Sequence, residues 1–153
     1  MDFDRAAAPR GGGRTVVVGL DDSDSAWRAA AYAVGLARRQ DALLVVVHVL
    51  PAHPTAMLAG LNWMLAADDL AVARHLEHRL AVGLAGTLGL PSPRWEFHIL
   101  RAADVVSGLA ETADGLRADT VVIGASRGLR RRLFGSPGVR LVRTGRWPVI
   151  VVP

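Results

Sequence analysis

The sequence contains no cysteine and no lysine, few aromatic residues and no long apolar run. Without cysteine the chain forms no disulfide and uses no thiolate chemistry, which predicts a reducing, cytoplasmic location. Its apolar runs are far shorter than the roughly eighteen residues that span a bilayer, so we expect no membrane segment. Residues 1–13 lack the apolar core of a secretory signal, and we expect them to form a flexible tail.

The remaining chain, residues 14–153, predicts one α/β domain. Half of the residues are hydrophobic (51%), enough for a sizeable core. Short runs of Val, Ile and Leu predict buried strands at residues 15–20, 42–50, 120–123 and 149–152, and alternation of apolar and polar residues predicts a strand at residues 94–100. Helical periodicity predicts helices at residues 26–39, 67–88, 102–116 and 136–144. Alternating strands and helices predict a parallel sheet with helices on both faces.

Two segments refine this prediction. Residues 51–63 contain two prolines and fit no period, so we expect a loop or a short helix there. The helix predicted at residues 67–88 should present one apolar face, formed by Leu70, Ala73, Leu76, Leu80 and Leu84.

Polar residues follow the first and fourth predicted strands. Asp21 and Asp22 could hold a ribose hydroxyl, a metal or a phosphoacceptor network, or could simply cap the next helix. The loop at residues 124–136 carries glycines, hydroxyls and arginines, and it leads into Ser136 and Pro137, a helix N-cap and first-turn pair. Such a loop can bind an oxyanion, or its arginines can be merely solvated. Ligands of open parallel sheets lie beyond the carboxyl ends of the strands, where the strand order reverses.

All 18 basic residues are arginine, and the formal net charge is +4. Several crowd into the last quarter of the chain: Arg127, Arg130, Arg131, Arg132, Arg140, Arg143 and Arg146. This cluster favours a phosphate-bearing small ligand or an acidic partner. Nucleic acid is disfavoured, because aromatic residues for base stacking are nearly absent beside the arginines.

No catalytic or metal-binding pattern is found, so we predict that the chain is not an enzyme. His75 and His78 have the spacing of two ligands on a helix but no further partner, which favours solvated positions. His48 falls within a predicted strand, where a packing role is expected. Ser126 and Ser136 have no base that the sequence identifies. Two enzyme-like families with an acid pair or a phosphate loop after the first strand are excluded. A response-regulator receiver needs a lysine, which the chain lacks, and an ATP pyrophosphatase needs a Ser-Gly-Gly run where this chain has Leu-Asp-Asp-Ser at residues 20–23.

Taken together, the motifs resemble the universal stress protein family over nearly the whole chain. They are VVVGLD at residues 16–21, VVVHV at 45–49, DTVVIG at 119–124, GS at 135–136 and PVIVV at 148–152. The resemblance implies a Rossmann-like open sheet of five parallel strands in the order 3-2-1-4-5, with the loops after strands one and four side by side. It also implies a homodimer, through antiparallel pairing of the last strand, Val149–Val152.

The resemblance further implies an adenine-nucleotide site, because many family members bind ATP. Their loop runs Gly, two residues, Gly, nine residues, then Gly and Ser or Thr. Gly124 matches its first glycine, and Gly135 with Ser136 match its last pair. Asp21 matches the acid near the nucleoside, and Val49 matches the residue of the second strand whose backbone lies near the base. The implied site comprises Leu20, Asp21, Val49, Gly124, Ala125, Ser126, Arg127, Gly128, Gly135 and Ser136.

The middle of this loop departs from the family pattern. Arg127 stands where the second glycine belongs; if Gly128 takes that place, Ala125 stands first, and either way the loop is two or three residues short. Arg127 resists the positive φ that glycine allows, and Pro137 has no N–H to offer. Two hypotheses follow. The chain is a stress-associated dimer that binds ATP or another adenine nucleotide, with Mg if it binds the triphosphate, without fast turnover. Alternatively, it is a nucleotide-free dimer that engages a protein partner.

Overall fold

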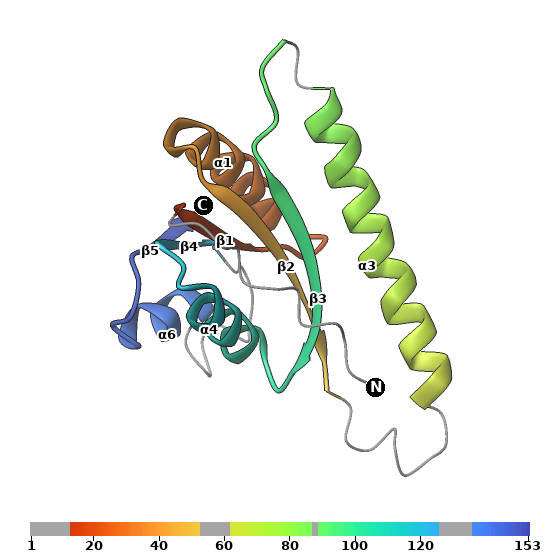
Figure 1. Cartoon of the computed structure of the whole chain (residues 1–153). Helices are drawn as coiled ribbons and strands as arrows, with labels where there is room; N and C mark the ends of the chain where they lie inside the picture. Colours follow the sequence, from red (N-terminus) through yellow and green to blue (C-terminus); the bar gives the residue numbers. More distant parts are fainter. Residues whose placement is uncertain (1–12, 53–61, 87–88, 126–135) are drawn as a thin grey trace.

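Five parallel strands form one sheet in the computed structural model, which describes residues 13–52, 62–86, 89–125 and 136–153. The strands are β1 (Thr15–Gly19), β2 (Leu43–Pro51), β3 (Trp95–Ala102), β4 (Thr120–Gly124) and β5 (Val149–Val152). They lie in the order β3-β2-β1-β4-β5 (Figure 1). Every neighbouring pair is parallel. The predicted fold class and strand order are confirmed.

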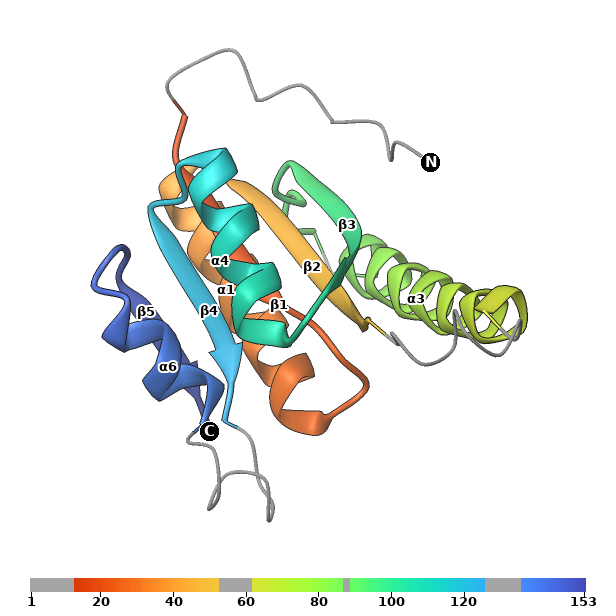
Figure 2. The same ribbon diagram turned by 90° about the horizontal axis from the view of Figure 1, so that it is seen from below.

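Helices cover both faces of the sheet. They are α1 (Asp24–Gln40), α3 (Asn62–Ala85), α4 (Val105–Leu116) and α6 (Pro137–Arg143). Helix α1 lies on one face and helices α4 and α6 on the other, while α3 runs alongside β3 (Figures 1 and 2). This is the arrangement that right-handed crossovers between parallel strands produce.

Alternate residues of the strands fill two separate cores. Val16 and Val18 of β1 pack with α1 and α3, whereas Val17 packs with α4 and α6. All three are completely buried. A strand covered on both faces needs apolar side chains at consecutive positions, which is why β1 reads as an unbroken valine run.

Two predicted helix starts were wrong by three residues or more. Helix α3 begins at Asn62, within the segment expected to be a loop or short helix, of which residues 53–61 lie outside the described residues. Helix α4 begins at Val105 and not at residue 102, because β3 continues to Ala102 and Asp104 caps the helix. The expected tail, residues 1–13, also lies outside the described residues apart from Gly13.

The apolar face predicted for α3 is confirmed in part. Its buried residues are Ala73, Leu76, Leu80 and Leu84. Leu70 is instead 36% exposed. The neighbouring Asp69 pairs with Arg101, at 3.2 Å, near the carboxyl end of β3. Leu70 therefore lies level with the carboxyl end of β3.

Candidate functional site

The strand order reverses between β1 and β4, and the loops that follow these strands begin next to each other. In the parallel register Val18 of β1 lies opposite Val122 of β4. Asp21 follows β1 and Ala125 follows β4, so both leave the sheet at the same carboxyl edge. This edge is the position at which open α/β sheets bind ligands.

The two adjacent aspartates after β1 have different partners. The Oδ1 atom of Asp21 accepts a hydrogen bond from the N–H of Ser23 at 2.9 Å, within its own turn. Asp22 instead accepts from Arg79 of α3 at 2.6 Å, and that guanidinium lies 4.5 Å from the centre of the Trp27 ring. Asp22 thus joins the turn to α3. The carboxylate of Asp21 is exposed, and within the described part of the chain its Oδ2 accepts no hydrogen bond.

Leu20 directly follows β1 and Val49 lies on the neighbouring strand β2, and their side chains point into different surroundings. Leu20 is buried, and its carbonyl oxygen lies 2.8 Å from Nδ1 of His48 on β2. Val49 packs over α4, where a Cβ built on Gly108 would lie 2.8 Å from its Cγ2. The contact of His48 was missed from the sequence, where a packing role was expected. The available signal was a polar residue in an otherwise apolar strand.

Gly124 is required by packing at this edge. A Cβ at this position would lie 2.5 Å from the backbone carbon of Ser25, 2.6 Å from its oxygen and 2.7 Å from the nitrogen of Ala26. The first turn of α1 therefore rests directly on the end of β4. The next residue, Ala125, donates its N–H to the carbonyl of Val152 at 2.7 Å, so this amide already has a partner.

Ser136 caps α6 as predicted. Its Oγ accepts a hydrogen bond from the N–H of Val139 at 3.3 Å, and Pro137 occupies the first helical position. The other candidates from the loop lie outside the described residues: Ser126, Arg127, Gly128 and Gly135.

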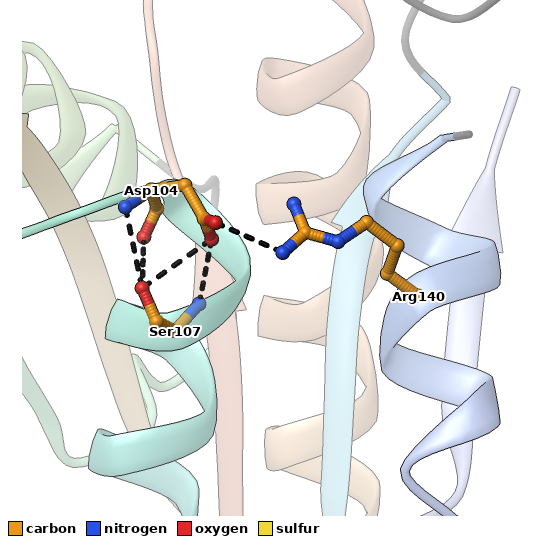
Figure 3. A network of polar contacts seen from close by, with 3 residues as sticks. All are labelled: Asp104, Ser107 and Arg140. Carbon is orange, nitrogen blue, oxygen red and sulfur yellow. Dashed lines mark hydrogen bonds and ion pairs between the residues drawn. The ribbon is translucent and has the colours of Figure 1, made fainter. Parts of the chain in front are cut away.

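Two arginines of the predicted basic cluster form ion pairs with helix α4. Arg140 donates to Oδ2 of Asp104 at 2.9 Å, and Arg146 pairs with Asp114. Asp104 also forms a capping box with Ser107, whose backbone N–H donates to Oδ1 of Asp104 at 2.9 Å (Figure 3). These arginines therefore hold α6 and the segment after it against α4. An incoming anion would have to compete with carboxylates for them.

The carboxyl of Asp104 provides a test of this network. The N–H of Ser107, followed by the guanidinium of Arg140, holds the pKa of Asp104 below its usual value. A lowered pKa stabilises the fold above the unfolded-state pKa, and this contribution is lost as the pH falls through the folded-state pKa. We expect Arg140→Met to raise the pKa of Asp104 only part of the way, because the larger cause, Ser107, remains. NMR titration of the Asp104 carboxyl carbon measures this.

The matched control for that titration is Arg146→Met, which removes an arginine from a different ion pair, the one with Asp114. It should leave the pKa of Asp104 where it is in the unmodified chain. An Asp104 pKa that does not move in Arg140→Met would contradict the assigned ion pair.

No metal centre and no membrane span are found in the part of the chain that the structure describes. Among those residues, no group of three or more His, Cys, Asp or Glu side chains could hold a metal ion. None of the described helices has the length and apolar character needed to cross a membrane. His75 and His78 are exposed, which confirms the solvated positions favoured for them.

Comparisons with known proteins agree with the fold. The model of the universal stress protein family matches residues 13–153. A universal stress protein of Methanocaldococcus jannaschii is 27% identical over 142 residues, which cover 91% of this chain and 81% of the relative.

Two solved structures illustrate the likeness. A universal stress protein in complex with cAMP is 26% identical, with a TM-score of 0.64, and the match covers 94% of this chain and 98% of that one. A universal stress protein from Archaeoglobus fulgidus in complex with dAMP is 24% identical, also with a TM-score of 0.64, over 92% of this chain and 98% of that one. At 24% identity the second structure supports the fold alone.

Proposed function

The chain belongs to the universal stress protein family, and we propose that it binds an adenine nucleotide beyond the carboxyl ends of β1 and β4. The observation that carries this proposal is the exposed carboxylate of Asp21 at the carboxyl edge that β1 shares with β4. The relative solved with cAMP supports the choice of nucleotide. We further propose that residues 14–153 form one universal stress protein domain, acting in the cytoplasm in the stress response.

Among the described residues, the nucleoside end of the ligand would meet a free hydrogen-bond acceptor, whereas the phosphate end would meet few free backbone donors. The Oδ2 atom of Asp21 is available to accept a hydrogen bond from a ribose hydroxyl, and the backbone of Leu20 and of Val49, at the ends of β1 and β2, would lie near the base. At the phosphate end, the N–H of Ala125 is engaged with Val152 and Pro137 has none. Phosphate contacts would then depend on residues 126–136, with Arg127 and Gly135 among them. We therefore expect AMP, ADP and ATP to bind with dissociation constants within about tenfold of one another, with Mg accompanying only the triphosphate.

Rapid turnover of the nucleotide is not part of the proposal. Efficient attack on a phosphate needs a positioned base or metal at the reacting atoms. The proposed role is binding and signalling of nucleotide levels, with hydrolysis slow at most.

Thermal melting with millimolar AMP, ADP, ATP and GTP tests the proposal. A ligand at a hundred times its dissociation constant adds about 2.7 kcal/mol of stability. For a chain of this size that corresponds to a rise of roughly 5–10 °C in the melting temperature. GTP is the matched control for the base and should give a smaller rise. If none of the three adenine nucleotides raises the melting temperature, the proposed function is wrong.

We also propose a homodimer through the edge strand β5. The carbonyls of Pro148 and Val152 accept from the N–H groups of Val121 and Ala125, so these residues face β4. Because backbone groups of successive strand residues point to opposite sides, Val151 directs its N–H away from the sheet. Its side chain is 45% exposed. A second β5 could pair along this edge.

Sedimentation velocity tests this interface with the variant Val151→Pro. Proline at an outward-facing edge position removes an N–H that the sheet does not use and blocks pairing. We expect the unmodified chain to sediment as a dimer and Val151→Pro as a folded monomer. A dimer that persists in Val151→Pro would assign the interface to another surface.

The second candidate function is a nucleotide-free dimer that engages a protein partner. The engaged N–H of Ala125 and the proline at position 137 favour it. Melting that no adenine nucleotide changes, combined with a dimer in sedimentation, would select this candidate over the first.

A further inference from the structure

We infer that His48 is a positioning residue, which fixes the turn that carries Asp21. The effect on ligand affinity rests on the proposed nucleotide site, but the effect on the turn does not. His48 lies on β2 in step with Leu44 and Val46, so its ring is on the face of the sheet that carries α1. It is half-buried, and its Nδ1 lies 2.8 Å from the carbonyl oxygen of Leu20.

This geometry determines which ring nitrogen carries the proton. A carbonyl oxygen can only accept a hydrogen bond, so Nδ1 of His48 must be the donor. The neutral ring is therefore the Nδ1–H tautomer, with the lone pair on Nε2. The same bond persists when the ring is protonated, because Nδ1 keeps its hydrogen.

The bond from His48 completes the attachment of Leu20 to β2. The N–H of Leu20 donates to the carbonyl of Val47 at 2.9 Å, and its carbonyl accepts from His48. Leu20 is 3% exposed, so its carbonyl would have little water to replace a lost partner. The N–H and the carbonyl of Leu20, the residue before Asp21, are thus both hydrogen-bonded to β2.

The attachment continues from Leu20 into helix α1. Asp21 is the next residue, and its Oδ1 accepts from the N–H of Ser23 at 2.9 Å. Ser23 in turn caps α1, its Oγ accepting from the N–H of Ala26 at 3.2 Å. With the peptide before Asp21 fixed by His48 and the turn after it fixed by the helix cap, the Asp21 carboxylate is held in one orientation. Its Oδ2 is then presented at the proposed ribose position without a cost of ordering on binding.

Two variants separate the hydrogen bond from the volume of the side chain. His48→Asn keeps a donor, because the amide Nδ2 stands where Nδ1 stood. His48→Leu has similar bulk and no donor. The matched control is His98→Leu on β3, which removes a half-buried histidine whose Nε2 contacts Glu96 at 2.8 Å and not the backbone of the turn.

NMR on the unliganded protein tests the inference without any nucleotide. Long-range ¹⁵N correlation at mildly alkaline pH should show the Nδ1–H tautomer of His48. Three-bond couplings should show one χ1 rotamer for Asp21 in the unmodified chain, in His48→Asn and in His98→Leu, and averaged rotamers in His48→Leu. An Nε2–H tautomer, or an Asp21 rotamer that His48→Leu leaves unchanged, overturns the inference.

Titration with AMP then tests the consequence for binding. Losing one neutral hydrogen bond that orders the acceptor should weaken binding by roughly two- to tenfold in His48→Leu. His48→Asn and His98→Leu should stay close to the unmodified affinity. Equal affinity of His48→Leu and the unmodified chain overturns the positioning role. If the unmodified chain binds no adenine nucleotide, the proposed function fails, and the rotamer measurement alone decides the inference.

Discussion

Replacing Gly124 with alanine should lower the free energy of unfolding by about 3 kcal/mol, the upper end of what overpacking a core costs. The added Cβ would lie 2.5–2.7 Å from three backbone atoms of Ser25 and Ala26. A flexible side chain could rotate away from such a contact, but the first turn of α1 cannot. The helix would have to shift as a body off the end of β4. Urea unfolding followed by circular dichroism measures this loss.

Gly83→Ala is the matched control for that measurement. Gly83 lies within α3, and a Cβ built on it meets nothing within 4 Å. Alanine there should stabilise the helix by about 0.5–1 kcal/mol. Similar urea midpoints for Gly124→Ala and the unmodified chain would show that α1 does not rest on β4 as described.

Replacing Asp21 with alanine should weaken AMP binding by roughly ten- to hundredfold. A hydrogen bond to a charged group contributes about 1.5–3 kcal/mol, and each 1.4 kcal/mol or so is a factor of ten in affinity. The substitution removes the exposed acceptor Oδ2 and also the contact of Oδ1 with Ser23 that shapes the turn. Isothermal titration calorimetry with AMP measures the change.

Two further variants separate the charge of Asp21 from its place in the turn. Asp21→Asn keeps an oxygen to accept from Ser23 and should fall between the unmodified chain and Asp21→Ala. Asp41→Asn removes the same charge at the opposite end of α1, where residue 41 has a φ of 49° that asparagine adopts readily. It should bind AMP normally. Equal affinities of Asp21→Ala and Asp41→Asn would remove Asp21 from the site.

The sheet could be predicted from the sequence because each strand has a local signature. Consecutive apolar β-branched residues, as in Val16–Val18, identify a strand buried on both faces. The order of the strands came from the resemblance to a family, since periodicity does not say which strands are neighbours. The start of α4 was missed because its capping box has an unusual sequence. The N-cap is usually Ser or Thr and the third helical residue Glu or Gln, whereas here the N-cap is the acidic Asp104 and the third residue is Ser107.

The site was less predictable because its contacts join residues distant in sequence. Asp21 and Asp22 are indistinguishable as a motif, yet Asp22 is engaged by Arg79, 57 residues away. Gly124 has the place of a phosphate-loop glycine in the motif, and its close contact with Ser25 appears only when α1 is packed on β4. Arg140 was grouped with the other arginines of the last quarter, and its partner Asp104 lies 36 residues before it.

The amide ¹H–¹⁵N spectrum of the protein titrated with AMP tests the central claim most directly. If the nucleotide binds at the reversal of strand order, the shifts should concentrate on Leu20, Asp21, Val49, Ala125 and Ser136, at the carboxyl ends of β1, β2 and β4. The opposite edge of the sheet, with Thr15, Asp41 and Asp119, should remain unperturbed. A spectrum that millimolar AMP leaves unchanged, or shifts confined to the opposite edge, would contradict the account.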